Sequence, residues 1–185
     1  MRLILHIGMP KTGTTAIQRF LLTNPEELAK RGYGMLEGIG VPSNKLLAVY
    51  FSGKKPQQIA PDFAATNHLD TVKNKDLFMA SSGFISEIDR QLAILGESCH
   101  TVVISSEQLS QHLLTKSELC ELREWSQRRF HNVQIICVVR DPIHGIPSLW
   151  TEAVRAGARI SLSRFVFKTI KRLKSSNSDA RNNPL

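Results

Sequence analysis

Residues 2–15 read RLILHIGMPKTGTT, and this stretch decides the fold. Residues 2–7 form a short, nearly continuous apolar run, which is typical of a strand buried in a parallel sheet. The run stops at Gly8, and from Thr14 onward the apolar spacing changes to that of a helix. The stretch therefore predicts a strand, a glycine-containing loop and a helix in direct succession.

The rest of the chain continues this alternation of strands and helices. We expect further helices over 25–31, 84–95 and 117–130, strands over 33–36, 101–105 and 133–139, and a last helix capped by Asp141. Residues 37–80 show only weak periodicity, which predicts loops and short helices. The alternation predicts a three-layer α/β fold, in which a mostly parallel sheet is flanked by helices and ligands bind at the carboxyl ends of the strands.

Apolar spacing and cysteine usage also predict which residues form the core. The helix over 84–95 places on one face Phe84, Ile88, Leu92 and Leu95. In the helix over 117–130, the residues that we expect to contact the core are Leu119, Leu122 and Phe130. Three widely spaced cysteines build neither a disulfide framework nor a paired-cysteine metal site. We expect reduced core thiols at Cys99, Cys120 and Cys137.

Composition and charge narrow the class of protein. With 185 residues, 42% hydrophobic and 22% charged, the chain has ordinary globular usage, which excludes a disordered or fibrous protein. Its apolar runs are too short for a membrane span, and we find no secretory signal. We therefore expect a cytoplasmic protein. Of the net charge of +8, most comes from residues 129–185, with 10 Lys and Arg against 3 Asp and Glu. This asymmetry suits an anionic partner, and a solvated basic helix and tail is the alternative explanation.

The loop between the first strand and helix carries the chemistry. Residues 8–15 read GMPKTGTT, in which Gly8 and Gly13 permit tight turns and close backbone approach. Backbone N–H groups at a helix start bind anionic oxygens, and Lys11 adds a positive charge. The loop therefore predicts a phosphate site. Its lysine precedes the second glycine by two residues, whereas the ATPase and kinase pattern GxxxxGK[ST] has lysine directly after it.

The loop resembles the first signature of sulfotransferases that use 3′-phosphoadenosine 5′-phosphosulfate (PAPS). The matching residues are Pro10, Lys11, Thr12, Gly13, Thr14 and Thr15. The family's second signature is an arginine at the end of a later strand, followed eight residues on by a serine in the next helix. Arg140 and Ser148 have this spacing. The resemblance covers residues 1 to about 167 and implies a P-loop nucleotide-binding fold of the sulfotransferase type.

The resemblance also implies a role for each matched residue. Lys11 is expected to stabilise the charge on the departing phosphate oxygen, while the loop amides with Thr14 and Thr15 hold the 5′-phosphate. Arg140 and Ser148 are expected to bind the 3′-phosphate, the arginine through its planar guanidinium. The implied reaction transfers the sulfuryl group from PAPS to a hydroxyl or amine, with a glycan acceptor favoured and PAP as product. We expect no metal in this scheme.

The acceptor hydroxyl requires a general base, for which the best candidate is Glu107 in ISSEQLS, after the 101–105 strand. A surface or capping carboxylate is the alternative explanation for this residue. His112 is a weaker candidate base. His6, inside the first strand, is expected to be a core histidine beneath the loop, and His144 to belong to the first turn of the last predicted helix.

The resemblance is incomplete toward the C-terminus. Family catalytic domains contribute a further strand, more helices and a basic loop, so we expect residues 1–174 to be one incomplete domain and 175–185 a disordered polar tail. An apolar helical stripe lacks an obvious partner there and favours self-association: Leu162, Phe165, Val166, Ile170 and Leu173. The alternatives to an active sulfotransferase are a truncated non-catalytic PAP-binding protein, a P-loop kinase and a basic nucleic-acid binder. We expect neither nucleic acid nor membrane as partner.

Overall fold

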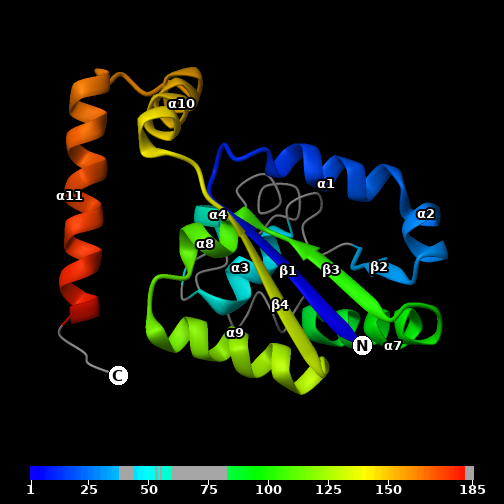
Figure 1. The fold of residues 1–185 in the computed structure, drawn as a ribbon. Helices are drawn as coiled ribbons and strands as arrows, with labels where there is room; N and C mark the ends of the chain where they lie inside the picture. The colour runs from blue at the N-terminus through cyan, green and yellow to red at the C-terminus, as the bar shows by residue number, and fades with distance from the viewer. Residues whose placement is uncertain (38–43, 53, 55, 60–82, 182–185) are drawn as a thin grey trace. The chain divides into compact units, whose positions relative to one another are not determined.

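The computed structural model of this chain describes residues 1–37, 44–52, 54, 56–59 and 83–181. Its internal contacts divide the chain into two compact units, Met1–Val138 and Val139–Leu185. Figure 1 labels the helices and strands along the chain.

A sheet of four parallel strands forms the centre of the first unit (Figure 1). The strands are β1 (Arg2–Gly8), β2 (Tyr33–Met35), β3 (Thr101–Ser105) and β4 (Asn132–Val138), in the order β2-β3-β1-β4. β1 pairs with both β3 and β4, so Leu5 lies between Ile104 and Ile135. The parallel sheet flanked by helices confirms the α/β prediction.

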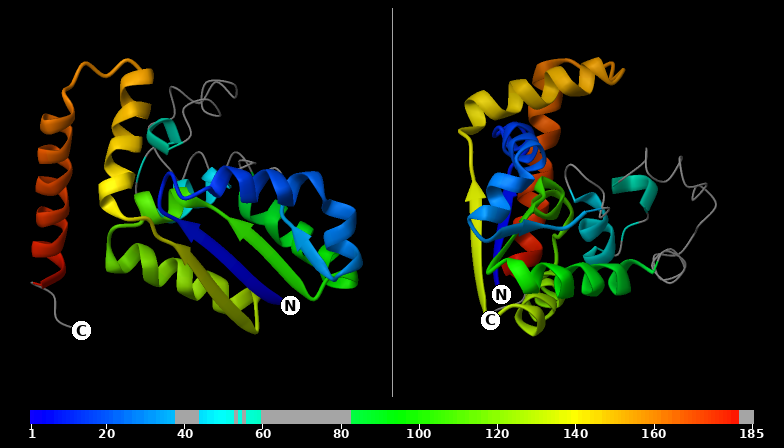
Figure 2. Two further views of the ribbon diagram at one scale, coloured as in Figure 1. Left: turned by 45° about the horizontal axis from the view of Figure 1, so that its top comes forward. Right: turned by 90° about the vertical axis from the view of Figure 1, so that its right-hand side faces the viewer.

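The hydrophobic core lies on one face of this sheet. Leu3 and Leu5 of β1, together with Val102 and Ile104 of β3, are almost completely buried. They belong to one cluster with apolar side chains of three helices, namely α3 (Lys45–Phe51), α7 (Phe84–Ser98) and α9 (Lys116–Arg129). The views in Figure 2 show these helices together on the same side of the strands. This packing fixes the strands whose carboxyl ends carry the candidate site.

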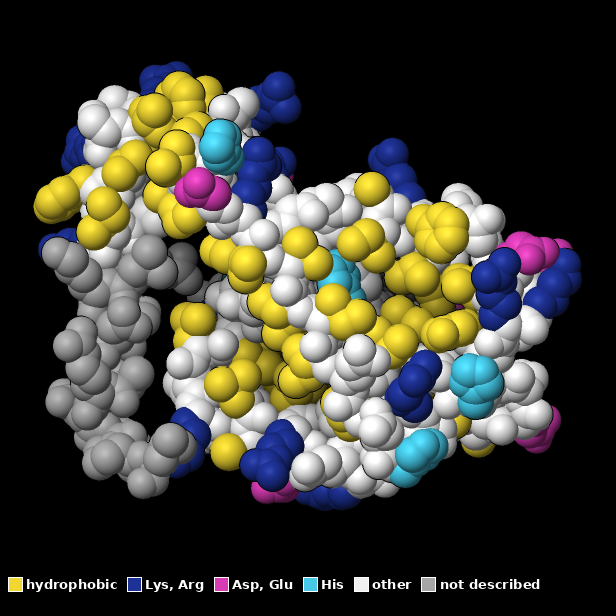
Figure 3. All heavy atoms as spheres, in the orientation of Figure 1, with side chains coloured by type: hydrophobic (Ala, Val, Ile, Leu, Met, Phe, Trp, Pro, Cys, Tyr) yellow, Lys and Arg dark blue, Asp and Glu magenta, His cyan; other side chains and the backbone are white. Residues whose placement is uncertain are grey.

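The opposite face of the sheet carries His6 and Ser105, which are neighbours in register. Helix α1 (Thr14–Thr23) packs here and buries Thr14 and Gln18. Its apolar face, by contrast, is largely exposed, with Ile17 at 38% and Phe20 at 59% of full accessibility. Hydrophobic side chains are accordingly visible over this region in Figure 3. The helix thus turns a polar face, not its apolar one, toward the end of the sheet.

The remaining helices in the described part of the first unit are short. They are α2 (Pro25–Lys30), α4 (Pro56–Ile59) and α8 (Glu107–His112). Gly32 follows α2 with a φ of 74°, and its N–H donates to the carbonyl of Ala29, which confirms the predicted glycine cap. Short helices confirm the prediction for the described part of residues 37–80. The rest of that segment lies outside the described residues.

The second unit contains two helices, α10 (Pro142–Arg155) and α11 (Leu162–Arg181). The Asp141 side chain accepts a hydrogen bond of 2.9 Å from the N–H of Ile143, which confirms the predicted cap. Trp150 Nε1 donates to the Ile160 carbonyl at 2.8 Å, fastening the connection between the helices. Helix α11 continues to Arg181, inside the segment for which the sequence predicts disorder. None of the described helices is long and apolar enough to cross a membrane.

Three of the predicted core residues are exposed. Leu122 and Phe130 are buried as predicted, but Leu119 is 53% exposed because it lines an open apolar groove of about 360 Å³ between α9 and strands β1 and β4. All three cysteines are free thiols, yet only Cys99 is buried. Cys120 lies on the outer side of α9, and Cys137 lies on β4, an edge strand of the described sheet. The prediction of core positions was therefore wrong for Leu119, Cys120 and Cys137.

Candidate functional site

The 8–15 loop lies at the carboxyl end of β1, where the sequence predicts it. The N–H of Met9 donates to the carbonyl of Val138 at 3.0 Å, so the loop begins as a continuation of the β1–β4 pairing. Thr12 Oγ1 donates back to the carbonyl of Met9 at 2.7 Å. These two bonds fix the first half of the loop to the sheet and close it into a turn.

Two residues of the loop have left-handed backbone conformations. Gly13 has a φ of 85°, which glycine adopts without strain, and Lys11 has a φ of 67°, which is unusual for a residue with a Cβ. Alternation of this kind turns successive backbone N–H groups toward one point and creates a concave anion site. The strain at Lys11 costs about 1–3 kcal/mol, and such strain is concentrated at functional sites.

Helix α1 begins at Thr14, with Gly13 as its cap and no side chain bonded to the amides of its first turn. An uncapped helix N-terminus has donors and a partial positive charge to offer an anion. Around it, Pro10, Lys11 and Thr12 are half-buried, Gly13 and Thr15 are exposed, and Thr14 is buried. The left-handed residues of the loop and the uncapped helix start are features that a phosphate site requires, and phosphate binding stays a prediction.

Gly8 has no room for a side chain. A Cβ at this position would lie 2.6 Å from Cγ2 of Thr14 and 2.9 Å from Oγ1 of Thr12. Gly8 and Thr14, which lie near the two ends of the loop, therefore pack closely together. This contact explains in steric terms why the strand ends on glycine.

His6 lies directly beneath the loop and is 4% exposed, as predicted for a core histidine. Its Nδ1 is 2.8 Å from Oγ of Ser105, and its buried Nε2 has no hydrogen-bond partner in the described structure. Burial lowers the pKa of His6 below its usual 6.5, and the negative charge of Glu107 opposes this shift in part. Burial thus favours the neutral form of the histidine beneath the loop.

Glu107 is the first residue of α8 and follows the end of β3 after one residue, Ser106. Its Oε2 accepts a hydrogen bond of 2.6 Å from Nε2 of Gln18, which belongs to α1. Ser110, one turn further along α8, donates from Oγ to the Gly8 carbonyl at 2.6 Å. The structure thus bonds Glu107 to helix α1 and bonds α8 to Gly8 at the start of the loop, and the role of Glu107 as general base stays a prediction.

The other two histidines named from the sequence are held differently. In the weaker base candidate, His112, Nδ1 lies 3.2 Å from Nζ of Lys54 and Nε2 lies 3.1 Å from Oε1 of Gln108. Both ring nitrogens are therefore already engaged. His144 is exposed in the first turn of α10, with Nδ1 3.9 Å from Oδ2 of Asp141, as predicted.

Arg140 and Ser148 belong to the second unit. Arg140 is exposed and directly precedes the cap of α10, while Ser148 is half-buried in the second turn of that helix. Arg140 thus lies in the connection between β4 and α10, and Ser148, eight residues later, lies in the helix, as the sequence predicts. Their binding to a 3′-phosphate stays a prediction.

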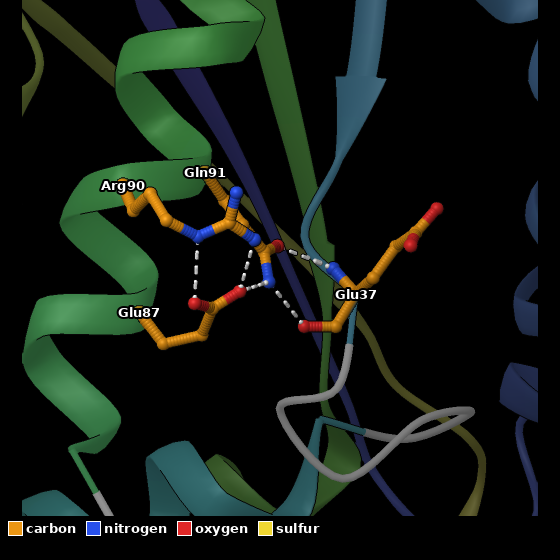
Figure 4. Close-up of polar contacts among 4 residues, drawn as sticks. All are labelled: Glu37, Glu87, Arg90 and Gln91. Atoms are coloured by element: carbon orange, nitrogen blue, oxygen red, sulfur yellow. Dashed lines mark hydrogen bonds and ion pairs between the residues drawn. The ribbon is translucent and has the colours of Figure 1, made fainter.

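A second polar cluster joins α7 to the end of β2 (Figure 4). The Gln91 side chain accepts from the N–H of Glu37 at 2.7 Å and donates to its carbonyl at 2.9 Å, as a neighbouring strand would. Arg90 forms two hydrogen bonds with Glu87, of 2.8 and 2.7 Å. These groups bind one another beside an open groove of about 480 Å³, so the cluster is a structural fastening of the chain after β2.

Sequence reasoning missed Gln18 as a site residue. Apolar spacing draws attention to the exposed face of α1, whereas Gln18 lies one turn after Thr14 on the buried face. In the part of the chain that the structure describes, no group of three or more His, Cys, Asp and Glu residues could hold a metal ion. No protein-family model matches this chain, and no curated protein matches it either.

Proposed function

We propose that this chain is a PAPS-dependent sulfotransferase that transfers the sulfuryl group to a hydroxyl-bearing acceptor, with a glycan favoured. The observation that carries the proposal is the 8–15 loop. It combines left-handed Lys11 and Gly13 with the uncapped start of α1, at the carboxyl end of a central parallel strand. Ligand sites of parallel α/β sheets lie at this edge.

The chemistry of the loop residues fits a phosphate bearing a reactive group. PAPS supplies an activated sulfuryl group when it is bound. The amides of Gly13, Thr14 and Thr15 are suited to hold its 5′-phosphate, and the Lys11 ammonium to neutralise charge on the oxygen that leaves sulfur. Sulfuryl transfer, like phosphoryl transfer, depends mainly on positioning and charge neutralisation. A loop whose first half is fixed to the sheet supports this positioning.

Glu107 supports the transfer half of the proposal. Its carboxylate is half-buried at the carboxyl end of β3, and α8 also contacts the loop through Ser110. A carboxylate in this position is suited to accept the proton of an acceptor hydroxyl. The proposal also includes the predicted binding of the 3′-phosphate by Arg140 and Ser148. Because AMP lacks this phosphate, such binding gives a preference for PAP over AMP.

The test is a thermal-shift titration with PAP, with AMP and with ATP plus magnesium as comparison ligands. PAP at about 100 times its dissociation constant stabilises a binder by about 2.7 kcal/mol, which raises the melting temperature by roughly 5–11 °C. Turnover of PAPS to PAP then measures transfer. Lys11→Ala is expected to lower turnover more than PAP affinity, whereas Lys116→Ala, at an exposed lysine on α9, leaves both unchanged.

The alternatives give different results in the same experiment. PAP binding without turnover identifies a non-catalytic PAP-binding protein. A shift that requires ATP and magnesium identifies a kinase, which the position of Lys11 in the loop disfavours. Salt-sensitive DNA or RNA binding that PAP does not affect identifies a basic nucleic-acid binder.

A further inference from the structure

One buried side chain joins the helix that follows the 8–15 loop to the candidate base. Gln18 is 3% exposed, and its Nε2 donates to Oε2 of Glu107 at 2.6 Å. A buried amide is costly unless it is hydrogen-bonded, and a bond to a carboxylate is shorter and stronger than a neutral one. Gln18 therefore occupies a buried position where most helices would carry an apolar residue, and its hydrogen bond to Glu107 offsets the cost of burying its amide.

The bond leaves half of the Glu107 carboxylate available. Gln18 contacts Oε2, and no described residue donates a hydrogen bond to Oε1. The backbone of Glu107 is fixed as well, because it begins α8 and the Ser110 hydroxyl bonds this helix to Gly8. One oxygen is thus held by the protein, while the other remains able to accept a proton.

We infer that Gln18 is a positioning residue, which holds Oε2 of Glu107 so that Oε1 receives the proton of the acceptor hydroxyl. This inference rests on the proposed function. As the hydroxyl oxygen bonds to sulfur, its proton passes to Oε1, the bond between sulfur and the phosphate oxygen breaks, and PAP leaves with that electron pair. Gln18 donates one hydrogen bond throughout and does not touch the reacting atoms.

The test compares two substitutions that differ in one donor. Gln18→Met keeps the length and shape of the side chain but removes the N–H, whereas Gln18→His retains a ring N–H at similar reach. Turnover of PAPS to PAP is measured with water alone and with desulfated heparin as a glycan probe. We expect Gln18→Met to lower kcat about 10- to 100-fold with the KM for PAPS within about twofold, and Gln18→His to recover most of the rate.

A double-mutant cycle separates positioning from a general effect on folding. If Gln18 acts through Glu107, the variant with both Gln18→Met and Glu107→Gln is no slower than Glu107→Gln alone. Gln127→Met, at an exposed glutamine of α9, is the matched control and keeps the wild-type rate. Additive losses, or a fall in PAP affinity as large as the fall in kcat, would overturn the role of Gln18.

The remaining outcomes distinguish this inference from the proposed function. If the wild-type chain turns over PAPS and Gln18→Met does so equally fast, the role of Gln18 is wrong and the proposed function stands. If the wild-type chain binds PAP without turning over PAPS, the proposed transfer is wrong, and the role of Gln18 in it is wrong as well.

Discussion

The substitution Gly8→Ala tests whether the close contact across the 8–15 loop shapes the phosphate site. The added Cβ would lie 2.6 Å from Cγ2 of Thr14, and ordinary contact begins at 3.4 Å, so the Thr14 side chain, or the start of α1 that carries it, must move by about 0.8 Å. Overpacking of this kind costs about 1–3 kcal/mol, which corresponds to a fall in melting temperature of roughly 2–12 °C. Displaced amides also bind an anion less well, and we expect at least about tenfold weaker PAP binding.

Gly96→Ala is the matched control for this substitution. Gly96 lies inside α7, and a Cβ there would meet Met1 only at 3.8 Å, which is ordinary contact. Alanine in a helix is favoured over glycine by about 0.5–1 kcal/mol, so this variant is expected to melt slightly higher and to bind PAP normally. Melting curves and calorimetric titration measure both quantities. A Gly8→Ala protein with wild-type melting temperature and PAP affinity would refute the steric reasoning.

Three further variants test other parts of the structure. Arg140→Ala is expected to lose the preference for PAP over AMP. A preference as large as that of the wild-type protein, measured in a competition assay, would show that the 3′-phosphate binds elsewhere. Burial lowers the pKa of His6 from 6.5, so its contribution to stability is complete above pH 6.5 and is lost as the pH falls below that value. The urea midpoint of His6→Asn should therefore drop less between pH 7.5 and 5.5 than that of the wild-type protein. The hydrogen bond from Arg90 lowers the pKa of Glu87 from 4.5 to about 2, so the stability it gives is lost between those pH values, and Glu87→Gln should flatten acid unfolding there.

Local features of the fold could be predicted from the sequence. The change from an unbroken apolar run to helical spacing at residues 2–15 locates β1, the loop and α1, and the Asp-Pro pair at 141–142 marks the start of α10. Each of these signals lies within a few neighbouring residues. Local backbone preference and apolar periodicity are sufficient to produce them.

The features that depend on tertiary contacts could not be predicted in the same way. Gln18 and Glu107 are separated by 89 positions, and nothing in either local pattern indicates that they meet. Leu119 has the spacing of a core residue, but the groove that it lines is open, and only the packing of α9 on the sheet determines this. The burial of a side chain is a property of its surroundings as much as of its own helix.

The central place of β1 in the sheet has a consequence for the order in which the protein takes shape during synthesis. The strand is synthesised before both of its partners, which are residues 101–105 and 132–138. Until both have emerged, the apolar segment LILHI has no neighbours and the loop after it has no anchor at Val138. Such distant pairing slows folding and leaves nascent chains prone to aggregation. The earliest-made part of the candidate site is therefore among the last to become ordered, and a chaperone that binds short apolar segments would find its target at the N-terminal strand.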